Sequence, residues 1–473
     1  MKETLEHELK LSVKRGFELP PLAADVVPKH LRATYHDTDD HRLARHGVTL
    51  RRRNDDGRDL WQLKLPSEGD RLEIESEANG PDVPLELQSL LTAYLRGSVL
   101  RPIAELHTLR RAVRVTDGHG PAAEVVHDSV RVLDGDRVVR EFDEVEVEQL
   151  SQGSARLIAR LERQLRAAGA KTSDGRPKVF QALDLPATAG ARARPGAPPV
   201  EHLRAFLHRQ FESLLLGDPA TRRGDSAGVH RMRVATRRLR SALKEAQRML
   251  ETSWVDETRA ELKWLGEVLG DVRDADVFAA YVKKEAEQLG ADAVQGGADL
   301  GNLIAERSVP ARARLAEALD SPRYLALLDR LEAIRESLPV TPARDSPERM
   351  LRRATRRTLR NLRGVGRTSS DGDLHALRIA AKRSRYAGEL AQSTRSRAAA
   401  RLTKRATALQ EVLGEHQDAV VAEARLGSLV AGATPAAAFV AGRLFGLQRE
   451  RREAARAALP KAAKKFRRAA RRA

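Results

Sequence analysis

The sequence predicts a multidomain α+β protein. We expect an N-terminal eight-stranded antiparallel β tunnel or barrel with flanking helices, then a C-terminal all-α helical bundle domain with an internal duplication. In the first 150 residues, charged and apolar residues alternate with a period of two, which is typical of strands with one charged face. Two stretches of the second half repeat each other at a nearly constant offset, as in a duplicated domain. A segment rich in Pro and Gly separates the halves and predicts a linker.

The first half contains eight runs that fit strands. They lie at about residues 5–11, 34–37, 49–53, 60–65, 72–77, 103–115, 124–132 and 144–148, and an amphipathic helix is expected at 154–169. Carboxylates gather on the first, fifth and eighth runs, whereas cations dominate the third, fourth and sixth. Eight strands suit a closed barrel, in which these acids and bases would share one polar lumen. The ordinary alternative is a half-buried sheet with a solvated outer face.

The residue types of this lumen indicate a ligand class. The chain has no cysteine, so a thiolate metal site is excluded. Paired carboxylates without cysteine or histidine suit a hard cation such as Mg²⁺ or Mn²⁺. Arginine and lysine side chains suit phosphate oxygens. A lumen with both kinds of side chain is therefore expected to bind a metal–polyphosphate complex.

Net charge and composition differ between the two halves of the chain. Residues 1–190 carry a net charge of −3 and the remainder carries +21, which points to a polyanion partner for the second half. We place the tunnel domain at residues 1–185, a Pro/Gly/Ala linker at 186–200, the helical domain at 201–460 with repeats at about 201–335 and 346–460, and a basic tail at 461–473. The tail is expected to be a frayed helix or a disordered arm. The start of the chain has no signal-peptide pattern, and the Ala-rich stretch 429–447 fits a buried helix better than a membrane span. A cytoplasmic protein is expected.

The repeated stretches are basic amphipathic helices. At about 100° per residue, each copy has one narrow cationic stripe that opens with a histidine, and apolar residues lie opposite. The stripes are His230, Arg233, Arg237 and Arg240 in the first copy, and His375, Arg378, Lys382 and Arg385 in the second. A solvated polar face is the alternative for one such helix, and the histidines could instead cap or pack helices. Recurrence of the stripe favours a polyanion site.

Several short motifs of the first half carry a family resemblance. They are Glu6-His7-Glu8-Leu9-Lys10, Tyr35-His36-Asp37-Thr38, Leu50-Arg51-Arg52-Arg53, Leu63-Lys64-Leu65, Arg71-Leu72-Glu73 and Glu144-Val145-Glu146-Val147-Glu148. In this order they resemble the triphosphate tunnel metalloenzymes of the CYTH superfamily, over about residues 1–185. The second half resembles the CHAD domain, a helical polyphosphate-binding module, over about residues 200–460. That match is carried by His230-x-x-Arg233, His375-x-x-Arg378, Arg273-Asp274 and Gln417-Asp418.

The resemblance implies roles for individual residues. The metal ligands would be Glu6, Glu8, Glu146 and Glu148, with Glu144 as a further candidate. Lys10, Arg51, Arg53, Lys64 and Arg110 would bind the triphosphate, and the register leaves Arg110 and Arg111 as alternatives. Glu6, Glu8, Lys10 and Glu146 form the expected catalytic set.

We expect metal-dependent hydrolysis of inorganic triphosphate or short polyphosphate in the tunnel, with Mg²⁺ or Mn²⁺ as cofactor. The helical domain would bind polyphosphate through the two stripes, and the protein could associate with polyphosphate granules. One alternative is a polyphosphate-binding and targeting protein whose tunnel does not cleave. Another is an enzyme that acts on thiamine triphosphate or ATP. Nucleic-acid binding is disfavoured, because aromatic residues make up only 4% of the chain and base-stacking platforms need them.

Overall fold

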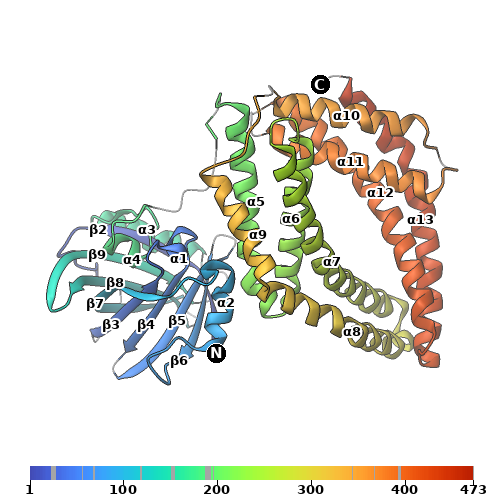
Figure 1. Cartoon of the computed structure of the whole chain (residues 1–473). Helices are drawn as coiled ribbons and strands as arrows, with labels where there is room; N and C mark the ends of the chain where they lie inside the picture. Colours follow the sequence, from blue (N-terminus) through green and yellow to red (C-terminus); the bar gives the residue numbers. More distant parts are fainter. Residues whose placement is uncertain are drawn as a thin grey trace. The chain divides into compact units, whose positions relative to one another are not determined.

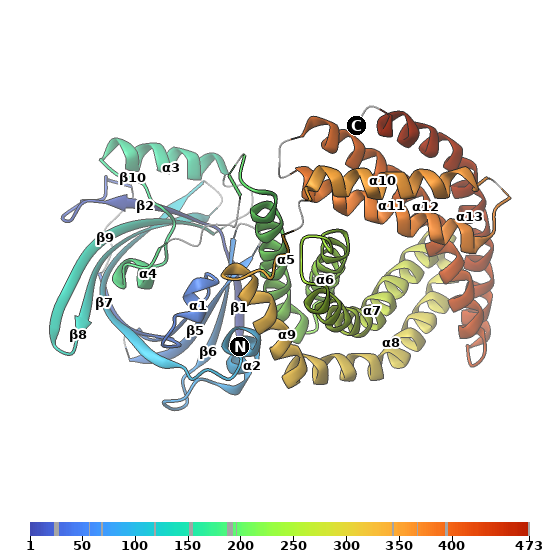
Figure 2. The ribbon, with the colours of Figure 1, turned by 45° about the horizontal axis from the view of Figure 1, so that its top comes forward.

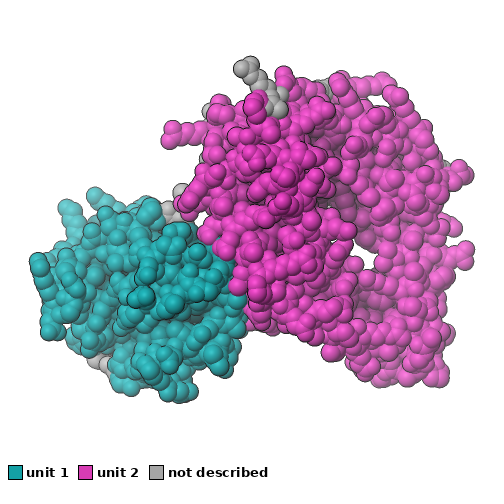
Figure 3. Space-filling view, in the orientation of Figure 1, with its two compact units in different colours: residues 1–189 teal, residues 190–473 magenta. Residues whose placement is uncertain are grey.

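The computed structural model describes residues 1–22, 28–55, 57–67, 70–117, 120–150, 155–186, 193–194, 196–342, 345–366, 368–392 and 396–471. The chain forms two compact units, Met1–Ala189 and Gly190–Ala473 (Figure 3). Each unit is described by itself below.

Unit 1 is an antiparallel sheet with short helices (Figure 1). The ten strands pair in the order β1-β6-β5-β4-β3-β7-β8-β9-β2-β10. Their bounds are β1 Lys2–Glu6, β2 Glu8–Val13, β3 Lys29–Asp37, β4 Thr49–Asp55, β5 Arg58–Ser67, β6 Asp70–Glu77, β7 Arg101–Thr116, β8 Pro121–Asp134, β9 Arg137–Gln149 and β10 Lys171–Thr172. The helices are α1 Arg42–Arg45, α2 Leu85–Leu95, α3 Ala155–Ala167 and α4 Lys178–Ala182.

The predicted closed eight-stranded barrel is wrong in two respects. The sheet has ten strands, and within the described residues no ladder joins its edge strands β1 and β10. The first expected strand is split at His7, because β1 pairs with β6 whereas β2 pairs with β9. The consecutive residues Glu6, His7 and Glu8 therefore connect the β6 side of the curved sheet to its β9 side (Figure 2). The connection is made by the chain itself and not by a ladder between β1 and β2. The alternation of charged and apolar residues does not reveal the break, because Glu6 and Glu8 are two residues apart and so fit one continuous strand.

Two of the apolar clusters in the described part of unit 1 position its helices α3 and α4. Helix α3 lays Leu157, Leu161 and Leu165 on Val125 and Val145 of the sheet, which confirms the amphipathic helix expected there. In the second cluster, Val179 and Phe180 of α4 pack with side chains of β3, β7 and β8. Burial of these two residues fixes the position of Lys178 at the start of α4.

Unit 2 is all-helical, as predicted. Its helices are α5 Pro199–Arg222, α6 Ser226–Glu245, α7 Thr252–Leu289, α8 Ala291–Asp320, α9 Pro322–Glu332, the 3₁₀ turn η1 Ala333–Arg335, α10 Pro347–Arg363, α11 Asp371–Gln392, α12 Arg397–Val430 and α13 Pro435–Ala470. Consecutive helices pack together in the series α5–α8 and again in the series α10–α13, and the series meet at α6–α11 and α8–α13. The internal duplication itself stays a prediction.

Two expectations for the helical half need correction. The described part of the basic tail is neither frayed nor disordered: α13 continues to Ala470, and Ala463 and Phe466 are buried in a cluster with residues of α10 and α12. The tail is so rich in lysine and arginine that its apolar residues at helical spacing were not recognised in the sequence. The stretch 429–447 is not one helix, because α12 ends at Val430 and α13 begins at Pro435. No helix in the described ranges has the length and apolar character needed to span a bilayer.

Candidate active site and cation-lined cavity

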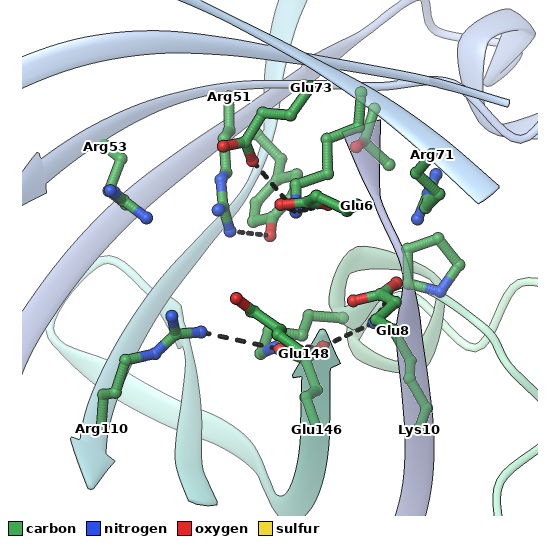
Figure 4. A pocket seen from close by; sticks show the side chains of 15 residues that line it. Glu6, Glu8, Lys10, Arg51, Arg53, Arg71, Glu73, Arg110, Glu146 and Glu148 are labelled. Atoms are coloured by element: carbon green, nitrogen blue, oxygen red, sulfur yellow. Dashed lines mark hydrogen bonds and ion pairs between the residues drawn. The ribbon is translucent and has the colours of Figure 1, made fainter. Parts of the chain in front are cut away.

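The curved sheet of unit 1 encloses a polar cavity of about 140 Å³. Alternate residues of a strand point to the same face, so β1, β2, β4, β5, β6, β7 and β9 each place charged side chains in it (Figure 4). Its charged lining residues are Glu6, Glu8, Lys10, Arg51, Arg53, Lys64, Arg71, Glu73, Arg110, Glu146, Glu148 and Lys178. Apart from the further candidate Glu144, every residue predicted for the metal and triphosphate sites is in this set, and the lining residue of the uncertain pair is Arg110, not Arg111.

Four of the five lumen carboxylates lie on the adjoining strands β2 and β9 and the edge strand β1, and the fifth, Glu73, lies on β6. Glu8 lies directly opposite Glu148 in the β2–β9 ladder, and Lys10 lies opposite Glu146. Burial, followed by repulsion from Glu146, raises the pKa of Glu148 to about 7. Burial also raises the pKa of Glu6, although the nearby Lys64 opposes the shift. Confined carboxylates whose charges repel one another attract a hard divalent cation, which makes Glu6, Glu8 and Glu148 candidate ligands for a metal such as Mg²⁺ or Mn²⁺.

A second group of carboxylates is more buried than Glu6, Glu8 and Glu148. One of its members, Asp128, was not predicted from the sequence. Oxygen atoms of Asp128, Glu144 and Glu146 lie within 4.8 Å of one another, close enough to share a metal. The ammonium group of Lys178 already lies among them, 3.1 Å from Asp128 and 3.0 Å from Glu146, and it also pairs with Glu144. Burial alone would lower the pKa of Lys178, but the three carboxylates raise it well above its ordinary value. This group is thus paired with the chain's own cations, Lys178 together with Arg110 and Lys10.

The predicted lysines of the lumen are held by carboxylates. Lys10 Nζ lies 2.7 Å from Glu146 and 3.7 Å from Glu8. Lys64 Nζ lies 2.6 Å from Glu6 and 3.0 Å from Glu73. These ion pairs fix the carboxylate positions before any ligand arrives.

The lumen arginines differ in how strongly they are neutralised. Arg110 donates two hydrogen bonds to Asp128, of 2.9 and 2.7 Å. Arg51 donates instead to two uncharged groups, the Tyr35 hydroxyl at 3.0 Å and Gln62 at 2.8 Å. Arg53 lies 3.6 Å from Asp55. Burial, and then the charges of Arg51 and Arg110, lower the pKa of Arg53, so an anion in the lumen would relieve the repulsion among these three arginines.

Four lining or supporting residues had no role predicted from the sequence. Tyr35 and Arg71 line the lumen, Lys178 adds a buried cation, and Asp128 anchors Arg110. Tyr35 was inside a recognised motif and could have been found there. The sequence indicates the burial of Lys178 only weakly, because the lysine lies between Pro177 and two apolar residues in a short segment.

In unit 2, the two repeated stripes line one cavity of about 590 Å³. Helix α6 contributes His230, Arg233 and Arg237, while α11 contributes His375, Arg378 and Lys382. Helices α7, α12 and α13 add further cations, Arg273, Arg425 and Arg451. The remaining predicted residues, Arg240 and Arg385, are not among the lining residues; Arg385 lies 3.4 Å from Glu389 and stacks on the Tyr386 ring at 4.5 Å.

The cavity cations repel one another. Burial, then the charges of Arg378 and Arg237, lower the pKa of Lys382 to about 7. Burial and the charge of Arg273 likewise lower the pKa of His230. Two aspartates offset part of this charge: Asp274 pairs with Arg233 and lies 3.4 Å from Arg425, and Asp418 lies 3.7 Å from Arg378. An anionic ligand would be stabilised by the same cations that now repel one another.

Comparison with known proteins matches both units. The CYTH domain family matches residues 4–173, and the CHAD domain family matches residues 205–427. Two uncharacterized proteins of Mycobacterium tuberculosis, Rv2226 and MT2285, are each 31% identical over 486 residues, which cover 94% of this chain and 91% of each relative.

Two solved structures are similar to part of the chain. PptA from Streptomyces chartreusis has 22% identity and a TM-score of 0.48, and the match covers 57% of this chain and all of PptA. The CHAD domain from the plant Ricinus communis has 27% identity and a TM-score of 0.46, with 60% of this chain and 95% of that domain covered.

Proposed function

Because the chain belongs to the CYTH family through residues 4–173 and to the CHAD family through residues 205–427, we propose a function for each unit. Unit 1 hydrolyses inorganic triphosphate or short polyphosphate with Mg²⁺ or Mn²⁺, and unit 2 binds inorganic polyphosphate. The observation that carries the first part is a single lumen in which the carboxylates of Glu6, Glu8 and Glu148 face the guanidinium groups of Arg51 and Arg53 (Figure 4).

In this proposal the chain's residues position the substrate. Arg51 and Arg53 bind oxygens of the triphosphate, since arginine offers several N–H donors to one phosphate group. Lys10 and Lys64 keep the lumen carboxylates in place through the ion pairs described above. A divalent cation held by Glu6, Glu8 and Glu148 would supply charge neutralisation and a water of lowered pKa. Hydrolysis of triphosphate forms a bond from a water oxygen to the terminal phosphorus and breaks the anhydride P–O bond, so that phosphate and pyrophosphate are the products and the proton of the water is released to solvent. No covalent enzyme intermediate is required.

The lining of the lumen favours an inorganic substrate over ATP or thiamine triphosphate. Among its described lining residues, Tyr35 carries the only aromatic ring, and its hydroxyl accepts a hydrogen bond from Arg51. Base recognition commonly uses aromatic stacking, and this lining offers little for it.

The test is phosphate release from tripolyphosphate, ATP and thiamine triphosphate with Mg²⁺ or Mn²⁺. We expect release from tripolyphosphate that stops when the metal is chelated, with slower release from the two organic triphosphates. Absence of release from tripolyphosphate with either metal would favour the alternative, a binding and targeting protein that does not cleave.

Polyphosphate binding by unit 2 is supported by the cavity that unites the two basic stripes. Reversal of charge at Arg233, Arg237, Arg378 and Lys382 in the full chain should remove most of the affinity for long-chain polyphosphate. Binding should also weaken as salt increases, because phosphate–cation contacts release counterions. Retention of wild-type affinity by this variant would contradict the assignment. Such binding would also allow association with polyphosphate granules.

A further inference from the structure

Helix α10 of unit 2 carries an arginine stripe outside the cavity described above. Seven of its 17 residues are arginines and one, Glu348, is acidic. At 100° per residue the arginines fall within an arc of about 140°, and the opposite face buries Met350, Leu351, Ala354 and Leu362. Arg356, Arg357, Arg360 and Arg363 are exposed. The apolar face fixes the helix in the core, so its cationic face is turned to solvent.

This stripe borders a separate hollow of about 1030 Å³. Arg353, Arg356, Arg357, Arg360 and Arg363 of α10 line one part of it. Lys244 and Arg248, at the end of α6 and just beyond it, line another part, and Arg353 donates a hydrogen bond to the Glu245 carbonyl at 3.4 Å. We call this hollow the α10 groove. Among its described lining residues, seven are cationic and only Glu245 is acidic.

Helix α6 connects the cavity to the α10 groove. His230, Arg233 and Arg237 of this helix line the cavity, and Lys244 nearer its C-terminal end lines the groove. His230 and Lys244 are separated by about 21 Å at the helical rise of 1.5 Å per residue. Arg237, the cavity residue nearest to Lys244 along α6, is about 10 Å from it by the same rise. A polyanion shorter than about 10 Å cannot contact both sites, whereas a longer one can, and a chain longer than about 21 Å can extend from His230 to Lys244.

The composition of the α10 groove indicates the kind of polyanion. No aromatic residue is found among its described lining residues, so it has no platform for stacking nucleic-acid bases. Met350, Leu351, Ala354 and Leu362 of α10 are buried, which leaves Leu359 as the one half-exposed large apolar residue of this helix, too little for insertion into a lipid surface. A flexible polyanion without bases fits these features best.

We propose that the α10 groove is a second binding segment for long-chain inorganic polyphosphate, which it contacts where the chain leaves the cavity along α6. The inference rests on the proposed polyphosphate function of unit 2. Two linked contacts on one polymer bind more tightly than either alone, because the second contact forms intramolecularly. The groove therefore makes affinity depend on chain length.

The test compares full-length variants in binding to long-chain polyphosphate and to a polyphosphate shorter than the roughly 10 Å between Arg237 and Lys244, with EDTA present to suppress binding in the lumen. The double variant Arg356→Glu, Arg360→Glu should lose roughly tenfold in affinity for the long chain and keep wild-type affinity for the short one. Arg233→Glu with Arg378→Glu should weaken binding of both. Arg443→Glu with Arg449→Glu is the matched control, because these exposed α13 residues line neither site.

Circular dichroism and the unfolding temperature establish that each variant is folded; if the glutamates disrupt α10, Arg356→Gln with Arg360→Gln replaces them. If a folded groove variant binds the long chain as tightly as the control does, the inference is overturned, while the loss in the cavity variant still supports the proposed function. If the wild-type protein binds neither polyphosphate, the proposed function itself fails. If single-stranded oligonucleotides of equal charge bind as tightly as the long chain and compete with it for the groove, the assignment to a polyanion without bases is overturned.

Discussion

Lys382 is the cavity residue best suited to respond to pH. Its pKa is lowered to about 7, chiefly by burial and then by Arg378 and Arg237. A bound polyanion favours the charged ammonium and raises this pKa. Binding therefore takes up a proton near neutral pH.

We expect the affinity for polyphosphate to be highest below pH 7 and to decrease as the pH rises through 7. The decrease should end above the pKa that Lys382 has in the complex. Titration calorimetry between pH 6 and pH 8, in two buffers of different ionisation enthalpy, measures both the affinity and the proton uptake. Lys382→Arg keeps the charge at every pH and should flatten this part of the profile. An unchanged profile in that variant would assign the dependence elsewhere, first to His230.

Asp274 and Asp418 act as internal counterions of the cavity. They compete with a polyanion for Arg233 and Arg378. Asp418→Asn should therefore tighten polyphosphate binding, roughly two- to fivefold given the ordinary strength of partly exposed ion pairs. Weaker binding in this variant would indicate that Asp418 positions Arg378 for the ligand.

Lys178 should be essential for the stability of unit 1. Its ammonium group neutralises Asp128, Glu144 and Glu146, and removal of one partner from a buried ionic group costs about 3–5 kcal/mol. Lys178→Met should lower the free energy of unfolding by this order, as measured by denaturant unfolding. The three carboxylates would lose one of their buried cations, which raises their pKa values in the folded state, so the loss should shrink as the pH falls and they become protonated. A loss that is independent of pH would contradict this explanation.

At the residue scale, the sequence predicted the lumen better than the buried layer behind it. Period-two alternation placed Glu8, Lys10 and Glu146 on one face, and the structure brings them together. Asp128 and Lys178 could not be predicted, because their pairing depends on how α4 packs against the sheet. Arg240 and Arg385 were predicted from helical spacing alone, which does not give the point at which the cavity ends.

At the scale of elements, helical periodicity predicted the faces of α6 and α11 but not what surrounds them. The sequence did not reveal that both stripes would face one cavity, since that depends on the contact between α6 and α11. The same limit applies to the sheet: strand positions follow from alternation, whereas the change of partner at His7 depends on pairing with β6 and β9.

Close packing of α5 and α6 fixes the start of the first stripe. A Cβ atom added at Gly228 would lie 2.5 Å from the Thr221 backbone nitrogen and 2.8 Å from Ala220, and His230 follows two residues later. Gly228→Ala should therefore destabilise the protein by about 1–3 kcal/mol and weaken polyphosphate binding. Gly414→Ala in α12 is the matched control, because a Cβ atom there meets nothing within 4 Å, and it should stabilise by about 0.5–1 kcal/mol. Thermal unfolding of both variants tests this prediction. An equal change in unfolding temperature in the two variants would contradict the role of close packing at Gly228.

At the scale of the whole molecule, the fused units suggest that polymer capture supports hydrolysis. A chain bound by unit 2 raises the local concentration of polyphosphate at unit 1 through the covalent linkage. In the full-length protein, Arg233→Glu with Arg378→Glu should leave kcat and KM for tripolyphosphate unchanged and raise KM for long-chain polyphosphate. Steady-state phosphate release on both substrates measures this. An equal rise in both KM values would mean that the substitutions disturb the lumen.

Glu8→Gln tests the central claim, metal-dependent hydrolysis in the lumen, most directly. Glu8 lines the lumen opposite Glu148, and the substitution removes one carboxylate charge while it keeps the size of the side chain. Phosphate release from tripolyphosphate with Mg²⁺ or Mn²⁺ should be abolished, with an unchanged unfolding temperature and unchanged polyphosphate binding. Glu86→Gln on α2, outside the lumen, should behave like the wild-type protein. Turnover of Glu8→Gln at the wild-type rate would contradict the assignment of the metal site and of the reaction to this lumen.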